Sequence, residues 1–223
     1  MDGSKSDISF TSPPYNVGHN LGYDNDNKYE NYKDDNPEYL DLLIKSTEIS
    51  LNNSVYSFVN LQFLAGNKRE ILDYLYVFKE KFADIAFWKK LQVQPAMANN
   101  VMNSQTECVF IFSNESKSRA INTGEFRGNV SNIIETNSVS SENKNSKIHS
   151  ATFPIKFVSY FVDNFSKKGD TVLDPFGGLG STLIACEQTD RTCFMMERDP
   201  NYCDVIRKRY YKFIGKEEEW NLK

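Results

Sequence analysis

The chain has 223 residues, of which 39% are hydrophobic and 25% charged, which fits one folded α/β domain and excludes a disordered chain or a large multidomain enzyme. Its 30 acidic and 26 basic side chains give a net charge of -4, so no overall attraction draws it to nucleic acid, although a local basic cleft can coexist with an acidic whole. No apolar run approaches the ~20 residues of a membrane span, and no secretory signal opens the chain, so we expect a cytoplasmic protein without a membrane partner.

Strands and helices alternate along the sequence, as they do in a mostly parallel sheet with helices on both faces. The first strand ends at two prolines, because proline donates no hydrogen bond to a sheet. The predicted elements, in chain order, are a strand over 8–11, a helix from 37 to about 53, a strand over 55–61, a helix over 68–82 that buries Ile71, Leu72, Leu75 and Phe78, strands over 85–88 and 106–113, a helix over 155–165, a strand over 171–174, a helix, a strand over 192–197 and a helix over 201–213.

Between these elements lies one long irregular region, over about 114–150, which is rich in Ser, Asn, Lys and Thr. A structureless segment of this length is uncommon inside a compact domain and is usually functional or disordered. The cysteines show neither a Cys-x-x-Cys pair nor a histidine at metal-ligand spacing, so we expect no metal and no disulfide framework.

A glycine-rich turn follows the strand over 171–174 and leads into a helix. It reads Asp174-Pro175-Phe176-Gly177-Gly178-Leu179-Gly180-Ser181-Thr182, with a carboxylate at the strand end and glycines where a backbone can approach a ligand closely. Glu197 ends the next strand, where doubly wound folds place the acid that binds ribose hydroxyls. Because an acid at position 174 would repel a pyrophosphate, the pattern favours a cationic or zwitterionic nucleoside cofactor. Taken alone, the turn is also consistent with tight packing of the strand against the helix.

The first strand ends in Ser12-Pro13-Pro14-Tyr15, and this tetrapeptide has the properties of a clamp for an amino group. Proline rings fix φ and remove N–H donors, so the Pro13 carbonyl and the Ser12 hydroxyl can both act as acceptors. Two acceptors on one exocyclic amino group would favour the tetrahedral geometry in which its nitrogen attacks. Tyr15 would stack on the base, which must leave the duplex to be reached. The alternative is a strand-ending turn with a packed tyrosine.

Together the two motifs resemble the family of S-adenosylmethionine-dependent DNA amino methyltransferases, which modify adenine N6 or cytosine N4. The clamp precedes the cofactor turn, which resembles the permuted class called β, and His149-Ser150-Ala151-Thr152-Phe153-Pro154 resembles that class's segment before the turn. The resemblance spans nearly the whole chain. It implies a Rossmann-like methyltransferase fold with circularly permuted motif order, one methyltransferase domain over 1–223, S-adenosylmethionine as cofactor and DNA as partner.

By this resemblance, the catalytic residues are Ser12, Pro13, Pro14 and Tyr15. The implied cofactor-binding residues are Thr11, Phe153, Asp174, Pro175, Phe176, Gly177, Gly178, Gly180, Ser181, Thr182 and Glu197, of which Ser181 and Thr182 would cap the helix. The irregular region occupies the place where β-class relatives carry target recognition. We expect its cations to contact phosphates and base edges, namely Lys117, Arg119, Arg127, Lys144 and Lys147. The alternative for this region is a solvated loop.

Two features depart from the family pattern. Relatives begin with an extra strand and helix, and that strand carries a Gly-Asp that touches the cofactor's adenine. Residues 1–7 resemble the end of the missing helix, so we expect an upstream domain or a partner chain to supply this unit. The turn also carries Leu179 and Ser181 where relatives usually have Ser and Thr.

The resemblance predicts a site-specific DNA methyltransferase of the kind found in restriction–modification, with direct attack by a flipped-out base. In this family a serine at the first clamp position more often accompanies methylation of cytosine N4, so the resemblance favours that target, with adenine N6 as the alternative. RNA adenine methyltransferases resemble Asp-Pro-Pro-Trp more, and protein-glutamine methyltransferases place the cofactor turn first. The alternative from another class is an inactive subunit that keeps the fold to bind nucleic acid; the missing strand favours it, and the intact Ser12, Tyr15, Asp174 and Glu197 oppose it.

Overall fold

The computed structural model describes residues 3–16, 36–93, 99–115, 118–137 and 153–221. Within these ranges seven strands form one sheet: β1 Ser6–Thr11, β2 Ser54–Leu61, β3 Phe82–Leu91, β4 Thr106–Ser113, β5 Ile133–Asn137, β6 Thr171–Asp174 and β7 Thr192–Met195. Their order across the sheet is β5-β3-β4-β2-β1-β6-β7. Since β1 lies in the middle although it comes first in the chain, segments far apart in sequence meet beside it.

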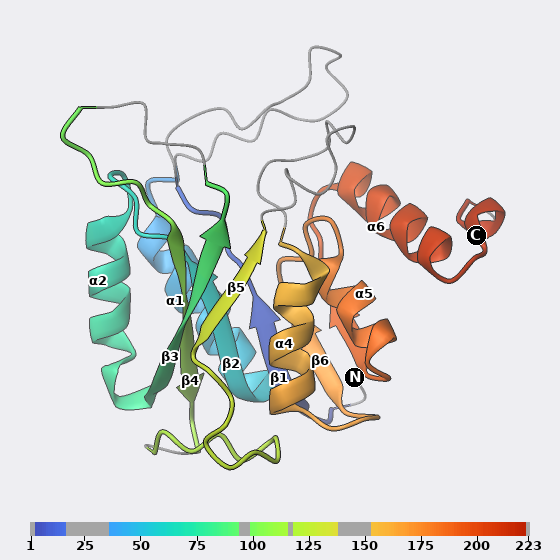
Figure 1. The fold of residues 1–223 in the computed structure, drawn as a ribbon, viewed down its shortest axis with the longest axis horizontal. Coiled ribbons are helices and arrows are strands. Elements are labelled where there is room, and N and C mark those ends of the chain that lie inside the picture. The colour runs from blue at the N-terminus through green and yellow to red at the C-terminus, as the bar shows by residue number, and fades with distance from the viewer. Residues whose placement is uncertain (1–2, 17–35, 94–98, 116–117, 138–152, 222–223) are drawn as a thin grey trace.

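The sheet is parallel with one exception. β1 pairs in parallel with β2 and β6, β6 with β7, and β3 with β5, whereas β4 runs antiparallel to both β2 and β3. All strands but β4 therefore point the same way, and their C-terminal ends meet at the upper edge in Figure 1. The expected mostly parallel α/β fold is confirmed.

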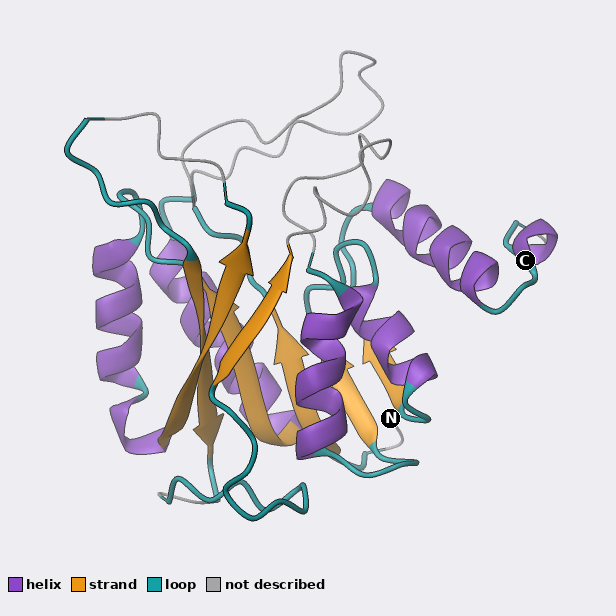
Figure 2. Cartoon of the chain, viewed as in Figure 1, coloured by secondary structure: helices purple, strands orange, loops and turns teal. Residues whose placement is uncertain are grey.

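Helices cover both faces of this sheet (Figure 2). The helices are α1 Tyr39–Asn53, α2 Lys68–Val77, α4 Ile155–Phe165, α5 Ser181–Gln188 and α6 Pro200–Phe213, with short 3-10 turns η1 Lys79–Lys81 and η2 Glu217–Glu219. α4 and α5 pack on one face and α1 and α2 on the other. Successive side chains of β4 point to opposite faces of the sheet: Val109 and Ile111 pack under α4, and Phe110 and Phe112 pack against α1 and α2. None of the helices in the described ranges is long and apolar enough to span a bilayer.

The helix predicted over 68–82 is shorter than expected. α2 ends at Val77, and η1 leads directly into β3. Its buried face is also different, because Leu72 is 60% exposed while Tyr74 is fully buried. The Tyr74 hydroxyl forms a hydrogen bond of 2.8 Å with Thr47 of α1, so a tyrosine takes the core position that the apolar pattern assigned to leucine.

Two further expectations about the chain's organisation were wrong. Residues 3–7 are not the end of a helix, because Ser6 and Asp7 belong to β1 and the Asp7 carboxylate accepts hydrogen bonds from the Thr171 backbone N–H at 2.8 Å and hydroxyl at 3.1 Å. The region over 114–150 is not continuously irregular, because β5 lies within it and pairs with β3. The Trp88 indole N–H donates to Thr136 Oγ1 at 2.8 Å, which secures this added strand.

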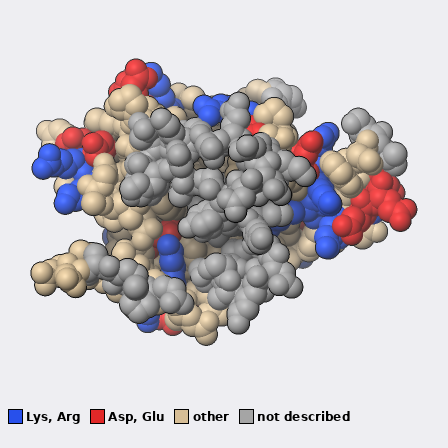
Figure 3. Space-filling view, turned by 90° about the horizontal axis from the view of Figure 1, so that it is seen from above, with Lys and Arg blue, Asp and Glu red and all other residues tan. Residues whose placement is uncertain are grey.

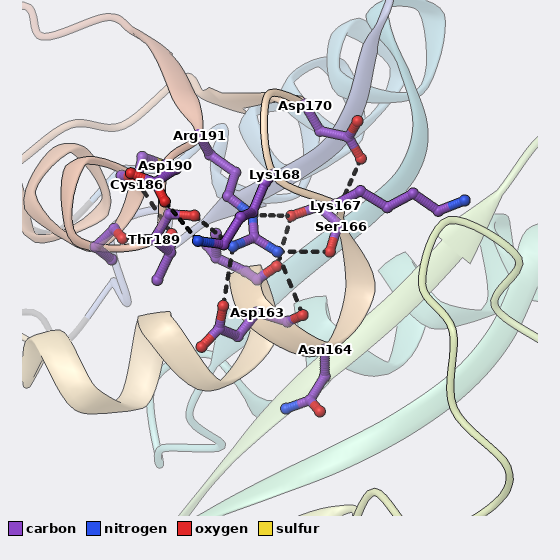
Figure 4. Close-up of polar contacts among 12 residues, drawn as sticks. Asp163, Asn164, Ser166, Lys167, Lys168, Asp170, Cys186, Thr189, Asp190 and Arg191 are labelled. Atoms are coloured by element: carbon purple, nitrogen blue, oxygen red, sulfur yellow. Dashed lines mark hydrogen bonds and ion pairs between the residues drawn. The ribbon is translucent and has the colours of Figure 1, made fainter.

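The buried Arg191 side chain forms hydrogen bonds with two loops that precede β6 and β7 (Figure 4). The Arg191 guanidinium donates to the carbonyl oxygens of Ser166 at 2.7 Å and Thr189 at 2.5 Å, to Ser166 Oγ at 3.1 Å and to the Asp163 carboxylate at 2.9 Å. These contacts join the loop between α4 and β6 to the loop between α5 and β7. One side chain therefore fixes where β6 and β7 begin.

We expect Arg191→Leu to lower the free energy of unfolding by at least about 2 kcal/mol, because it leaves buried carbonyl oxygens without a donor. Lys168→Met is the matched control, since Lys168 forms an exposed ion pair with Asp190 in the same loops. Urea denaturation of both variants checks this, and equal midpoints for Arg191→Leu and the wild type would contradict it.

Candidate active site

The structure brings the two sequence motifs together at the C-terminal edge of the sheet. β1 ends at Thr11, immediately before Ser12, and its neighbour β6 ends at Asp174. The Thr11 hydroxyl donates a hydrogen bond of 2.8 Å to Asp174 Oδ1. The Ser-Pro-Pro-Tyr segment and the glycine turn are thus held side by side, although more than half of the chain separates them.

Asp174 is the buried acid of the site, with 3% of its surface exposed. Besides Thr11, it accepts hydrogen bonds from Thr182 Oγ1 at 2.7 Å and from the Phe176 backbone N–H at 3.1 Å. Burial raises the pKa of Asp174 to about 6, and the hydrogen bonds from Thr182, Thr11 and Phe176 oppose that shift. At pH 7 the carboxyl group is therefore mainly ionised and places a negative charge at the base of the turn.

Two of the turn's glycines are required by packing and backbone conformation. A Cβ atom at Gly177 would lie 2.6 Å from Met195 Cγ and 3.1 Å from the Met196 carbonyl oxygen, so the turn can contact β7 closely only with glycine there. Gly180 has φ +76°, and a Cβ at that position would lie 3.0 Å from Ile206 of α6. The packing interpretation of the turn thus holds for these two positions.

Gly178 and Glu197 form the open side of the turn. Gly178 is exposed, has φ +52°, and would have only the Phe176 carbonyl oxygen, at 4.0 Å, near an added Cβ. Its N–H donates to Glu197 Oε2 at 2.7 Å, while Glu197 Oε1 accepts from the Asp199 N–H at 2.9 Å. The acid predicted from sequence therefore lies directly against the glycine turn, and each of its oxygens retains acceptor capacity.

Ser181 and Thr182 do not cap α5, contrary to expectation. The N-cap position is Gly180, which has no side chain, and both hydroxyls bond elsewhere. Thr182 bonds to Asp174, and Ser181 Oγ donates to the Phe153 carbonyl oxygen at 3.1 Å, which links the segment before α4 to the turn. The turn's remaining members, Pro175 and Phe176, are half-buried.

The Ser-Pro-Pro-Tyr segment ends in a polar cluster that includes two residues from other strands. Ser12 Oγ donates to the Tyr15 hydroxyl at 3.2 Å, and this hydroxyl donates to Glu107 Oε2 at 2.5 Å. Asn60 Nδ2 lies 2.5 Å from both Tyr15 Oη and Glu107 Oε2. Burial, with the neighbouring Glu107 carboxylate, raises the pKa of Tyr15 well above its usual value, so the hydroxyl keeps its proton.

Four polar residues that contact the motifs were not predicted from the sequence. Asn67 Nδ2 donates to the Tyr15 carbonyl oxygen at 2.6 Å, and the Arg209 guanidinium of α6 donates to the Leu179 carbonyl oxygen inside the turn. The others are Asn60 and Glu107. A signal existed for Glu107, because an acid at the start of an otherwise apolar strand requires a partner.

The predicted DNA-contacting cations do not gather around the clamp. Arg119 and Arg127 follow β4, which runs against the other strands, so they lie at the lower edge of the sheet in Figure 1, opposite Ser12. Arg119 forms an ion pair of 2.9 Å with Asp84 near the start of β3. This placement does not support a contact between these arginines and a base held at the clamp. Outside the described residues lie Lys117, Lys144, Lys147 and His149 to Thr152.

Further cations, which were not among the predicted DNA contacts, occur on α6, which projects from the body beside the upper edge (Figure 1). Figure 3, which views this edge from above, shows Lys and Arg side chains gathered there next to acidic side chains. The basic residues of α6 are Arg207, Lys208, Arg209 and Lys212, and the acids Glu217, Glu218 and Glu219 follow in η2. The helix therefore carries positive charge close to the glycine turn.

The chain is similar to DNA methyltransferases in sequence and in fold. A family model described as DNA methylase, N6_N4_Mtase, matches residues 6–208. The Type II methyltransferase M.HpaI of Haemophilus parainfluenzae is 22% identical over 94% of this chain and 69% of its own length. M.Cfr9I of Citrobacter freundii is 39% identical over 61 residues, which are 27% of this chain and 20% of that relative.

Solved structures share the fold. The PvuII DNA methyltransferase, described as cytosine-N4-specific, superposes with a TM-score of 0.67 at 18% identity, covering 98% of this chain and 88% of that one. The M1.HpyAVI–SAM complex superposes with a TM-score of 0.62 at 19% identity, covering 94% and 90%. Because the family model covers nearly the whole sheet and both motifs, the chain belongs to the N6_N4_Mtase family of DNA methylases.

Proposed function

We propose that the protein transfers a methyl group from S-adenosylmethionine to the exocyclic amino group of a DNA base. The observation that carries this proposal is the 2.8 Å hydrogen bond from Thr11 to Asp174, which holds the amino-group clamp against the glycine turn. Family membership supports the reaction, and the structural neighbour described as a SAM complex supports the cofactor.

The residues around the turn fit this cofactor. The buried Asp174 carboxylate provides the negative charge that suits a cation or zwitterion. Glu197 has acceptor capacity left for ribose hydroxyls, and the exposed Gly178 lets a ligand approach the backbone between the two acids. When bound, S-adenosylmethionine supplies an electrophilic methyl group on a sulfonium centre.

The clamp would hold the amino group that attacks this methyl. Ser12 and the Pro13 carbonyl would accept its N–H bonds, and the half-buried Tyr15 would stack on the flipped base. Asn60, whose backbone carbonyl oxygen lies 3.4 Å from Ser12 Oγ, also has a buried Oδ1 without a hydrogen-bond partner among the described residues.

For the finer assignments, we propose cytosine N4 as the first candidate target, with adenine N6 as the alternative outcome. Ser12 at the head of the clamp and the fold shared with the cytosine-N4-specific PvuII enzyme support it. The clamp-before-turn order supports the β class and one methyltransferase domain. An added strand from an upstream segment or a partner chain stays a prediction, and in the described part of the chain the sheet has two edge strands, β5 and β7, to which it could add.

The test combines cofactor binding with product analysis. Calorimetric titration of S-adenosylmethionine into the purified protein should show binding, and incubation with mixed-sequence DNA should yield N4-methylcytosine or N6-methyladenine by mass analysis of released nucleosides. The absence of both cofactor binding and any methylated base would favour the inactive nucleic-acid-binding subunit, and methylation of RNA alone would favour the RNA enzyme.

We expect Asp174→Asn to weaken S-adenosylmethionine binding by about tenfold or more, because it removes the charge while keeping the shape. Wild-type affinity should fall as the pH drops from 7.5 to 5.5, since Asp174, with a pKa of about 6, becomes protonated, whereas the variant should lack this dependence. Asp190→Asn, at the opposite edge, is the control. Identical pH profiles for Asp174→Asn and the wild type would contradict this role.

The same pKa has a consequence for stability. Because the folded-state pKa of about 6 lies above the ordinary 3.8, the unfolded chain releases this proton first as the pH rises. The free energy of unfolding of the wild type should therefore fall as the pH rises from about 4 to 6, and Asp174→Asn should lack this contribution. Urea denaturation of both proteins across this range, without cofactor, measures the difference.

We expect Tyr15→Ala to lower kcat/KM for DNA by about tenfold or more, since base–aromatic stacking contributes about 1–3 kcal/mol. Tyr76→Ala is the matched control, because Tyr76 lies on the outer face of α2 with 69% of its surface exposed. Steady-state methylation assays compare the two, and equal turnover by Tyr15→Ala and the wild type would remove Tyr15 from the clamp.

A further inference from the structure

Three strands place a charged pair against the clamp, in what we call the Glu107 cluster. In the sheet, Glu107 of β4 pairs with Trp88 of β3, and Val109, two residues later, pairs with Asn60 of β2. Because side chains two residues apart share a face, Glu107 and Asn60 lie on the α4 face at the edge that carries the clamp. The cluster comprises Ser12, Tyr15, Asn60, Lys90 and Glu107.

The hydrogen bonds of the cluster run in one direction. Ser12 donates to Tyr15, Tyr15 donates to Glu107 Oε2, and Asn60 Nδ2 donates to both Tyr15 and Glu107. The other acceptor within reach of Ser12 Oγ is the Asn60 carbonyl oxygen at 3.4 Å. In either case Ser12 donates its hydrogen to another atom of the protein, so the lone pairs of its oxygen remain available to accept from an N–H group of the target base.

The second carboxylate oxygen is used as well. Glu107 has only 4% of its surface exposed, and its Oε1 forms an ion pair with the Lys90 ammonium group. Lys90 also lies 5.2 Å from the centre of the Trp88 ring, which holds it beside the acid. Glu107 must therefore accept hydrogen bonds on both sides, from Lys90 on one oxygen and from Tyr15 and Asn60 on the other.

We propose that Glu107 is a positioning residue for methyl transfer: it sets the direction of the hydrogen bonds so that Ser12 presents lone pairs, and not its hydrogen, to the target amino group. This inference rests on the proposed function. A carboxylate suits the task because it accepts on both oxygens and donates nothing. Glutamine offers one acceptor oxygen, which Lys90 would take, so its NH₂ group would face Tyr15. The Tyr15 hydrogen would then turn toward Ser12 and occupy one of its lone pairs, which leaves the Ser12 hydrogen only the Asn60 carbonyl oxygen, at 3.4 Å, or the target itself.

The decisive variant is Glu107→Gln. We expect its kcat for DNA methylation to fall about tenfold or more, while its dissociation constant for S-adenosylmethionine stays within about twofold of the wild type. Lys89, which precedes Lys90 on β3 and forms an exposed ion pair with Glu135 of β5, provides the control Lys89→Gln, which should retain wild-type turnover. Wild-type kcat in Glu107→Gln would overturn the proposal.

A second substitution distinguishes an effect on the direction of the hydrogen bonds from a general disturbance of the structure. In Lys90→Gln/Glu107→Gln, the Gln at position 90 can accept from the amide at position 107, whose oxygen is then free to accept from Tyr15 and Asn60. We expect this double variant to recover kcat to within about threefold of the wild type, as expected for strongly coupled neighbours. A double variant that melts and binds cofactor like the wild type but stays as slow as Glu107→Gln would overturn the proposal.

Tyr15→Phe covers the case in which Glu107→Gln does not fold. It keeps the aromatic ring and deletes only the hydroxyl that connects Ser12 to Glu107, so kcat should again fall about tenfold, with DNA binding largely retained. Unchanged kcat in Tyr15→Phe would contradict the proposal. If the wild type itself methylates no base, the proposed function fails together with this inference, whereas an active wild type with unaffected variants overturns the inference alone.

Discussion

The buried carboxylate of Asp174 is the interaction on which the rest of the site depends. It accepts hydrogen bonds from the end of β1, from the start of α5 and from the backbone of its own turn, through Thr11, Thr182 and Phe176. Burying a charge is costly unless donors surround it, and these three donors offset that cost. The clamp directly follows Thr11, and the glycine turn directly follows Asp174. This acid therefore fixes the distance between the clamp, which would hold the attacking amino group, and the turn, which would hold the cofactor.

Much of the architecture could be predicted from sequence, because local signals were strong where polar residues, prolines or glycines flank apolar segments. The strands at Thr106–Ser113 and Thr171–Asp174 and the helix at Ile155–Phe165 have the predicted bounds. The meeting of the two motifs was also predictable, since the C-terminal ends of parallel strands share one edge. Glu197 beside Gly178 follows from the same rule.

What could not be predicted depends on contacts between distant strands. No local pattern states that Asn60, Lys90 and Glu107 come together, because their proximity arises from the antiparallel pairing of β4 with β2 and β3. The direction of β4 also carries Arg119 away from the clamp. Likewise, Ser181 and Thr182 have the composition of a helix cap, and only the position of Asp174 and Phe153 shows that their hydroxyls bond elsewhere.

The reversed direction of β4 gives the site a form of modularity. Every other strand delivers the residues that follow its last position to this edge, whereas β4 delivers those at its beginning. The register of β4 is set by the strand's own packing, with Val109 and Ile111 on one face of the sheet and Phe110 and Phe112 on the other. The connection between β3 and β4 can therefore change in length during evolution while the acid at position 107 keeps its place.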